Sequence, residues 1–285
     1  MAYTFSGHET FSCRHYWLKK GLDHVWCGKS FGDQAIIELG VGKNMVRSIR
    51  YWIRSFGLIE SDDTQTKIAE LIFSDKKGMD PYIEDIGSIW LLHYLLVTNE
   101  KASIYSLIFN HFRKQKVEFE ADQILQFLKD KCRIERVNFN ENSLSRDIGV
   151  FLNNYTLSPK PRSIEDEFSG LLYELNLIER SYKYGSTQYY RIETKERKSI
   201  PAEIILCCIL MKLEGSSISF HELLNGINHV GSVFAISSDS LHKKIEKITS
   251  KYHKEIVYSD DGGVQVLQFK KELDPLTVLK KYYGN

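Results

Sequence analysis

The residues between Val41 and Ile59 follow the apolar and polar period of a helix. Apolar residues recur at three- and four-residue spacing, which gathers them on one face: Met45, Val46, Ile49, Trp52, Ile53 and Phe56. The opposite face carries four cations within a stripe roughly 60° wide, here called the basic stripe: Lys43, Arg47, Arg50 and Arg54. No acidic residue interrupts the segment. The pattern therefore predicts one amphipathic helix with a cationic outer face.

The residues on either side of this helix predict a helix-turn-helix. Segment 31–39 has helical periodicity, and Gly-Val-Gly at 40–42 forms a tight turn. Gly57 supplies a left-handed end for the second helix, and an extended segment starts at Leu58. Helix, turn, helix and strand in this order is the winged-helix variant of the motif.

Comparable patterns divide the chain into three units, residues 1–115, 116–199 and 200–285. The first unit also contains an apolar segment over 82–97 that predicts a buried helix. Pro81 suits the first turn of this helix, because a missing N–H costs nothing there.

The middle unit predicts a degenerate copy of the first. We expect helices over 121–131 and 165–175, and between them a helix that Asn142 or Ser143 caps and Asp147 supports near its first turn. Segment 175–179 repeats the pattern of 56–60, with Asn176 in the left-handed position of Gly57. A hairpin around Gly185 completes the unit.

The last unit predicts helices followed by a hairpin. The helices are expected over 201–213, from the cap Ser219 to Leu224, and from Ser238 or Asp239 to Lys251. Strands over 255–258 and 264–269 are joined by Asp-Asp-Gly-Gly, which is a strong hairpin signal. The whole chain is therefore predicted to be mainly α (α+β), built of tandem winged-helix or helix-turn-helix-like units with small β-hairpins.

Composition restricts where a polyanion can bind. The 285 residues are 42% hydrophobic and 26% charged, as in an ordinary globular protein, and the formal net charge is only +1. A nearly neutral chain does not coat DNA indiscriminately, so a nucleic-acid surface must be a focused patch. The basic stripe fits double-stranded DNA, with Lys43, Arg47, Arg50 and Arg54 on phosphates and Asn44 on a base edge. A solvated helix face is the simpler alternative.

The cysteines and the apolar runs bear on localisation. The five cysteines form no C-x-x-C pair and no regular framework, which favours a reducing compartment. The N-terminus lacks the apolar core of a signal peptide, and the longest apolar run, 204–211, is too short to span a bilayer. These features predict a cytoplasmic protein with no membrane partner.

A first candidate for catalysis lies near the N-terminus. His8, Glu9 and Arg14 combine an imidazole, a carboxylate and a guanidinium, which together can polarise water and hold a phosphate. The structural alternative is the start of a helix, with Ser6 or Thr10 as the cap and Glu9 offsetting the helix dipole.

A second candidate is acidic. Asp80, Glu84 and Asp85 offer oxygen ligands for a divalent cation, Mg²⁺ or Mn²⁺. They fit equally well as favourable charges at the N-terminus of the helix expected over 82–97. Phosphodiester cleavage needs an activated nucleophile and charge neutralisation, so the two clusters together suggest a hydrolytic site if they meet in space.

Several short motifs resemble those of one bacterial family across nearly the whole chain: Ser-Gly-His-Glu-Thr-Phe at 6–11, Leu-Gly-Val-Gly-Lys-Asn-Met-Val at 39–46, Asp-Pro-Tyr-Ile-Glu-Asp at 80–85 and Asp-Pro-Leu at 274–276. It is a family of unknown function that includes the B component of single-strand DNA phosphorothioation (Ssp) systems. The resemblance implies a phage-defence protein that binds DNA and nicks one strand so that sulfur enters the backbone. It also implies a cysteine desulfurase, an ATP-pyrophosphatase-type sulfur transferase and an ATPase as partners.

Two other functions fit the same residues. One is a non-catalytic DNA-binding adaptor or transcriptional regulator that recruits modifying enzymes. The other is a scaffold whose winged units bind proteins. The resemblance supplies no catalytic residues, so the site candidates rest on their chemistry alone.

Overall fold

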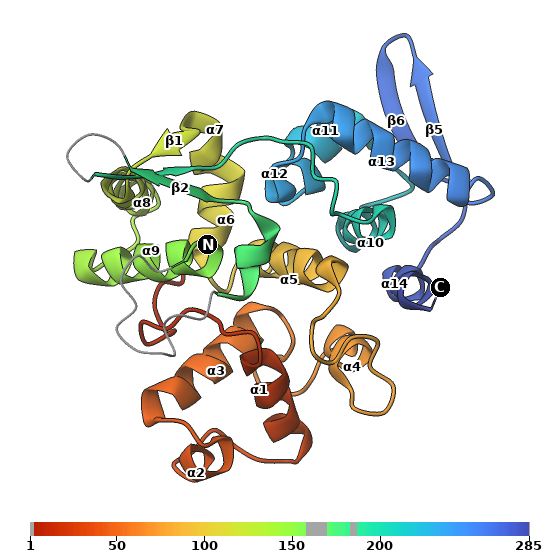
Figure 1. Ribbon diagram of the computed structural model, residues 1–285. Coiled ribbons are helices and arrows are strands. Elements are labelled where there is room, and N and C mark those ends of the chain that lie inside the picture. The colour runs from red at the N-terminus through yellow and green to blue at the C-terminus, as the bar shows by residue number, and fades with distance from the viewer. Residues whose placement is uncertain (1–2, 158–169, 183–186, 285) are drawn as a thin grey trace.

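The computed structural model describes residues 3–157, 170–182 and 187–284 (Figure 1). Helices predominate, and two antiparallel sheets of three strands each complete an α+β fold. This agrees with the predicted α+β class, and the tandem winged-helix units stay a prediction. Within the described ranges, no helix has the length and apolar character needed to cross a membrane.

The first segment is helical, and its elements are α1 (Trp17–Trp26), α2 (Ala35–Leu39), α3 (Lys43–Ser55), α4 (Lys67–Phe73), α5 (Ile86–Thr98), α6 (Ser103–Leu107), the π-helical turn η1 (Ile108–Phe112) and α7 (Arg113–Gln115). Helix α3 buries the predicted apolar face against α1 and α2. It ends as expected at Gly57, whose φ of 65° lies in the left-handed region. The expected strand after it is reduced to one antiparallel bridge between Ile59 and Gln65.

Two predicted helix starts in this segment are wrong. Helix α2 begins at Ala35 instead of residue 31, and α5 begins at Ile86 instead of residue 82. Asp85 caps α5 by accepting a hydrogen bond from the Gly87 N–H. Pro81 therefore lies in the preceding loop and not in the first turn of the helix.

The middle segment contains β1 (Glu118–Phe119), α8 (Ala121–Ile134), α9 (Glu141–Tyr155), the 3₁₀-helix η3 (Leu171–Leu175), β2 (Glu179–Tyr182) and β3 (Gln188–Arg191), and its sheet has the order β1-β3-β2. Asn176 has a φ of 48°, which confirms its left-handed position. The cap of α9 is Asn140, so the prediction of Asn142 or Ser143 was wrong by about half a turn. Part of the helix expected over 165–175, and Gly185, lie outside the described residues.

The last segment contains α10 (Ala202–Lys212), β4 (Ser217–Ser219), α11 (Phe220–Asn225), α12 (Val230–Phe234), α13 (Ser238–Lys251), β5 (Ile256–Asp261), β6 (Val264–Phe269) and α14 (Pro275–Tyr283), with the sheet order β4-β6-β5. Ser219 caps α11 as predicted, whereas α13 is capped by Ser237. The hairpin turn is Gly262-Gly263, and both residues have positive φ, as a two-residue turn of this kind requires.

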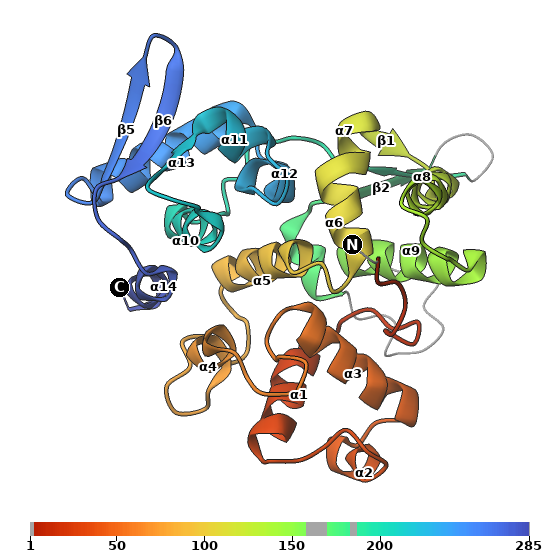
Figure 2. The ribbon, with the colours of Figure 1, turned by 180° about the vertical axis from the view of Figure 1, so that it is seen from behind.

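Helix α5 joins the three segments into one core. It contacts η3 of the middle segment and α10 and α12 of the last, and both views show it between the N-terminal helices and the C-terminal segment (Figures 1 and 2). His93 of α5 is fully buried and bonded to the Tyr155 hydroxyl and the Val233 carbonyl, each at 2.9 Å. Arg113 donates to the carbonyls of Gly231 and Ser232. The division into three units stays a prediction, because the segments share this interior.

Candidate nucleic-acid interface

The cations of the basic stripe lie on the outer face of α3. Their side chains are between 33% and 60% exposed, with Arg54 the least and Lys43 the most accessible. The opposite face is anchored by Val46, Ile49 and Trp52, which are at most 2% exposed. Burial of that face therefore fixes the direction in which the cations point.

Carboxylates from other parts of the chain approach every cation of the basic stripe. Asp33 lies 3.3 Å from Lys43, and Glu9 lies 3.6 Å from Arg47. Asp63 accepts from both remaining arginines, at 2.6 Å from Arg50 and 2.8 Å from Arg54. The stripe is exposed, but its charge is partly compensated within the protein.

Asp63 owes its position to the turn that follows α3. The bridge between Ile59 and Gln65 closes a short loop beside the helix. Asp63 stands at the tip of that loop with a φ of 65°, and the Ser61 carbonyl accepts a further bond from Arg54. This loop thus holds the two arginines with a carboxylate and a carbonyl.

An open groove of about 540 Å³ runs beside the stripe. Arg47, Arg50 and Arg54 line one side, Lys101 contributes a further cation, and segment 4–7 forms another wall. None of the described residues that line it is acidic. Lys101 was not a predicted site residue, and it carries no sequence signal, because only the packing of the loop after α5 brings it to α3. Lys43 and Asn44 are exposed at the start of α3, outside the groove lining.

His8 lies beneath this groove, not in it. The ring is 5% exposed and packs on Trp52 with a centroid separation of 6.3 Å. Its Nδ1 accepts from the Thr10 N–H, so its Nε2 carries the proton that is donated to Asp147 at 2.7 Å. Both ring nitrogens are therefore engaged within the protein.

Asp147 is the residue that the sequence analysis misassigned. It is 3% exposed and accepts the Ser6 N–H on both oxygens, at 2.8 and 3.0 Å, in addition to the bond from His8. It does not serve the dipole of α9 but ties the N-terminal segment to the middle segment. No helix starts near Thr10, because Ser6, Glu9 and Thr10 all have positive φ. The helix-start interpretation of segment 6–10 is therefore wrong.

The other two catalytic candidates point to different neighbours. Glu9 reaches Arg47, and so borders the basic stripe. The Arg14 guanidinium lies 5.1 Å above the centre of the Trp17 ring. Only Glu9 of the three candidates is thus in contact with a cation that lines the groove.

The acidic candidates lie at the junction of α5 and the C-terminal helix α14. Asp80 is 7% exposed and accepts the N–H groups of Glu84 and Asp85, at 2.9 and 3.0 Å, and the Ser88 hydroxyl. Asp85 caps α5 and also accepts from the Tyr282 hydroxyl at 2.7 Å. The Glu84 side chain is exposed.

These three bonds from protein donors engage both carboxylate oxygens of Asp80. Across the described ranges, no three His, Cys, Asp or Glu residues come together in a group that would hold a metal. No hydrogen bond or ion pair in those ranges joins His8 or Glu9 to segment 80–85. The two regions meet instead through the His15 ring, next to Arg14, which bonds to the Tyr82 carbonyl at 2.8 Å. His8 and Glu9 are thus not bonded to the acidic candidates within the described ranges, and the divalent cation stays a prediction.

Asp80→Asn is expected to lower the free energy of unfolding by about 2 kcal/mol in a buffer that contains a chelator, because an amide cannot accept all three hydrogen bonds. Urea denaturation of the variant measures the loss, and Glu84→Gln, at an exposed side chain, is the matched control with a change below about 0.5 kcal/mol. If the role of Asp80 were to bind a metal, Asp80→Asn would leave the stability of the metal-free protein unchanged. That outcome would contradict the prediction.

Known proteins with a similar structure were found over nearly the full chain. One is described as a magnesium ion-bound SspB crystal structure; it has 28% sequence identity and a TM-score of 0.87, with 99% of this chain and 88% of that chain covered. A second SspB crystal structure has 26% identity and a TM-score of 0.81, with the same coverage. A search of curated proteins found no significant match.

The family comparison agrees with the resemblance predicted from the short motifs. The model of a family described only as a protein of unknown function, DUF4007, matches residues 5–283, and both similar structures are SspB proteins. Because this match covers nearly the whole chain, the chain belongs to the DUF4007 family.

Proposed function

We propose that this protein is the SspB-type component of a bacterial DNA phosphorothioation and phage-defence system, and that it binds double-stranded DNA through α3. The observation that carries the proposal is the groove beside α3, whose described lining contains three arginines and Lys101 and no acidic residue, while Glu9 and Asp63 pair with the arginines from outside the lining. Likeness to SspB over 99% of the chain supports the assignment to such a system.

The carboxylates around the stripe do not prevent DNA binding. The exposed pairs of Lys43 with Asp33 and of Arg47 with Glu9 contribute about 0 to 1 kcal/mol each, because water screens them. Asp63, which is 26% exposed and shared by Arg50 and Arg54, holds these two arginines more firmly. A DNA phosphate that replaces Glu9 or Asp63 also releases condensed counterions, which favours the exchange. We therefore expect Glu9 and Asp63 to weaken binding and to hold the arginines extended until a duplex displaces them.

Strand nicking is the second part of the proposal, and it comes from the likeness to SspB. Glu9 is the candidate side chain that borders the groove, since His8 is engaged with Asp147 and Asp80 is buried. One of the similar SspB structures contains a magnesium ion, which we assign to no residue of this chain. The partners in the proposal are the desulfurase, sulfur transferase and ATPase of the system.

The same observation favours a non-catalytic adaptor as the alternative. With the imidazole of His8 and the carboxylates of Asp80 and Asp85 bonded inside the fold, the groove has cations for binding, and the carboxylates of Glu9 and Asp63 at its edge are paired with those cations. Such a surface suffices to hold DNA for enzymes of the same system.

Arg47→Glu is expected to weaken duplex binding about tenfold, or about 1.4 kcal/mol, and to reduce the log–log salt slope by about 1. Fluorescence anisotropy with a labelled duplex over a salt series measures both. Arg133→Glu is the matched control, because Arg133 is 59% exposed on α8 and is likewise ion-paired, to Asp130 at 3.0 Å. Equal affinities for the two variants would count against α3 as the DNA-binding surface.

Supercoiled plasmid separates the nickase from the adaptor. Wild-type protein with Mg²⁺ and the Arg133→Glu control are expected to convert the plasmid to open circles, whereas Glu9→Gln binds DNA but converts it at least tenfold more slowly. Tight binding without any conversion by wild-type protein supports the adaptor and contradicts the nicking part of the proposal.

A further inference from the structure

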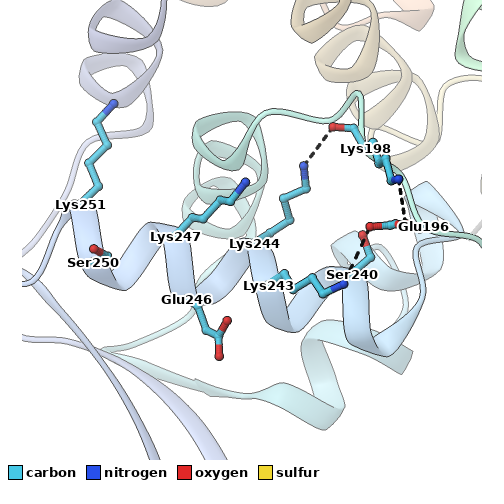
Figure 3. Close-up of a pocket in the computed structure, with 9 residues that line it drawn as sticks. All are labelled: Glu196, Lys198, Ser240, Lys243, Lys244, Glu246, Lys247, Ser250 and Lys251. Carbon is cyan, nitrogen blue, oxygen red and sulfur yellow. Dashed lines mark hydrogen bonds and ion pairs between the residues drawn. The ribbon is translucent and has the colours of Figure 1, made fainter.

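A second cationic surface lies on α13, far along the chain from the basic stripe. Lys243, Lys244, Lys247 and Lys251 share one side of this helix, while Leu241, Ile245 and Ile248 are buried on another. Lys198, from the linker before α10, adds a fifth ammonium group. Together they line an open groove of about 760 Å³, here called the lysine groove (Figure 3).

The lysine groove has more positive charge than its carboxylates neutralise. Its five lysines share the lining with two acidic residues, Glu196 and Glu246. Glu196 approaches Lys198 at 3.6 Å and Lys243 at 3.9 Å, both longer than a hydrogen bond. Glu246 points away from Lys244 and Lys247, to the other side of α13 (Figure 3). The groove therefore keeps a positive potential.

The individual lysines have different roles in this surface. Lys244 is held by the carbonyls of Lys198 and Ile200, which fixes the linker against α13. Lys251 pairs with Glu203 at 2.6 Å. The ammonium group of Lys247 makes no hydrogen bond or ion pair with any residue in the described ranges. The side chain of Lys243 is 66% exposed. Burial and the nearby charge of Lys247 lower the pKa of Lys244, which is a sign that cations are crowded here.

The position of α13 in the fold matches that of α3. The last segment runs helix, strand, two short helices, α13 and then the hairpin of β5 and β6, with β4 pairing to β6. In helix-turn-helix proteins, the helix in this position, just before the wing, is the one that meets DNA. The wing lies on the His242 side of α13, where that ring packs against Tyr258 at 5.3 Å. The lysines occupy the side that the hairpin leaves open.

The shape and chemistry of the groove suit a polymer backbone better than a small molecule. It is shallow and lined by ammonium groups, whereas sites for small ligands are enclosed and mostly apolar. Lys243 and Lys251 are eight residues apart on α13, which is about 12 Å along the helix, enough to follow about three phosphates of one strand. Lysines act as point charges without the bidentate geometry of arginine, which fits sequence-independent contact.

We propose that the lysine groove is a second DNA-binding surface, which holds the phosphate backbone of duplex DNA independently of α3. The two surfaces lie on opposite sides of α5 in both views (Figures 1 and 2), so they engage separate stretches of DNA. One surface thus positions the protein on the duplex at α3, and the other adds affinity without reading sequence.

The test uses the full chain with both Lys243 and Lys247 replaced by glutamate, since these two side chains take little part in the fold. We expect duplex affinity to fall about tenfold at low salt and the salt slope to lose about 1.8, on the rule of about 0.9 for each phosphate contact. Lys76→Glu with Lys77→Glu is the matched control, because both side chains are exposed in the loop after α4 and the change in net charge is the same. Circular dichroism melts verify that all variants fold.

Combination with Arg47→Glu separates this inference from the proposed function. Loss of affinity in the lysine variant alone supports the lysine groove and overturns α3, and loss in the Arg47 variant alone does the reverse. Additive losses, with the triple variant about a hundredfold weaker, support both surfaces. An unchanged affinity and salt slope in the lysine variant overturns the inference and leaves the groove to an acidic protein partner.

Discussion

Asp147→Ala is expected to lower the free energy of unfolding by about 4 kcal/mol, the largest effect of any single substitution considered for this protein. The carboxylate is 3% exposed and accepts from the Ser6 N–H and the His8 ring. Its removal leaves the buried His8 N–H without an acceptor, which costs about 1 to 3 kcal/mol, and it also breaks the charge-assisted bonds from the part-buried Ser6 N–H.

Urea denaturation at pH 7 measures this loss, and Asp130→Ala is the control. Asp130 is about half exposed on α8 and pairs only with neighbouring side chains of the same helix, so its removal should cost less than about 0.5 kcal/mol. A loss below about 1 kcal/mol for Asp147→Ala would show that the N-terminal segment finds other partners. Because segment 4–7 forms a wall of the groove beside α3, the variant should also bind duplex DNA more weakly than the control.

The second large effect is acid destabilisation through His93. Burial lowers the pKa of this imidazole from 6.5 to about 3, and the positive charge of Arg197 acts in the same direction, against the opposing effect of the Val233 hydrogen bond. Nε2 must donate to the Val233 carbonyl, so Nδ1 accepts from the Tyr155 hydroxyl and the neutral ring is fully satisfied.

Stability decreases as the pH falls, because the unfolded chain binds a proton at His93 more readily than the folded chain does. Above pH 6.5 both the folded and the unfolded chain hold His93 neutral, so its contribution to stability is complete. Between pH 6.5 and about 3, the unfolded chain takes up the proton and the folded chain does not, so stability falls with pH. At pH 4.5 the loss is about 3 kcal/mol, at 1.36 kcal/mol for each pH unit below 6.5.

His93→Leu isolates this contribution from all other titrating groups. The variant is less stable at pH 7, because Val233 and Tyr155 lose a partner, but it lacks the His93 titration. The difference in unfolding free energy between wild type and variant should therefore shrink by about 3 kcal/mol between pH 7 and pH 4.5. A difference that stays constant over this range would mean that the ring is protonated inside the fold.

Local sequence signals predicted most of the helices and turns. The apolar period over 41–59 gave α3 and its buried face, and Gly57 and Asn176 gave the left-handed residues that end two elements. Two glycines gave the turn between β5 and β6. These features depend on the backbone preferences of a few adjacent residues, which act in any tertiary context.

Apart from the helix ends, the errors concern side chains that bind partners outside their own local segment. Asp147 has the position of a helix-dipole residue, but a histidine 139 residues earlier uses it as an acceptor. Asp80 and Asp85 place negative charge near the start of α5, as one interpretation predicted. They also accept hydrogen bonds from the hydroxyl groups of Ser88 and Tyr282. No local pattern carries such contacts.

The sequence by itself determined that four cations lie on the outer face of α3, because helical period and the burial of apolar residues leave them no other direction. Only the tertiary structure decided how much of their charge is available, since Asp33, Glu9 and Asp63 reach them from three separate loops. Folding likewise added Lys101 to the first groove and Lys198 to the second. The physical reason is that helix faces follow from short-range periodicity, whereas electrostatic surfaces sum over charges that only chain packing brings together.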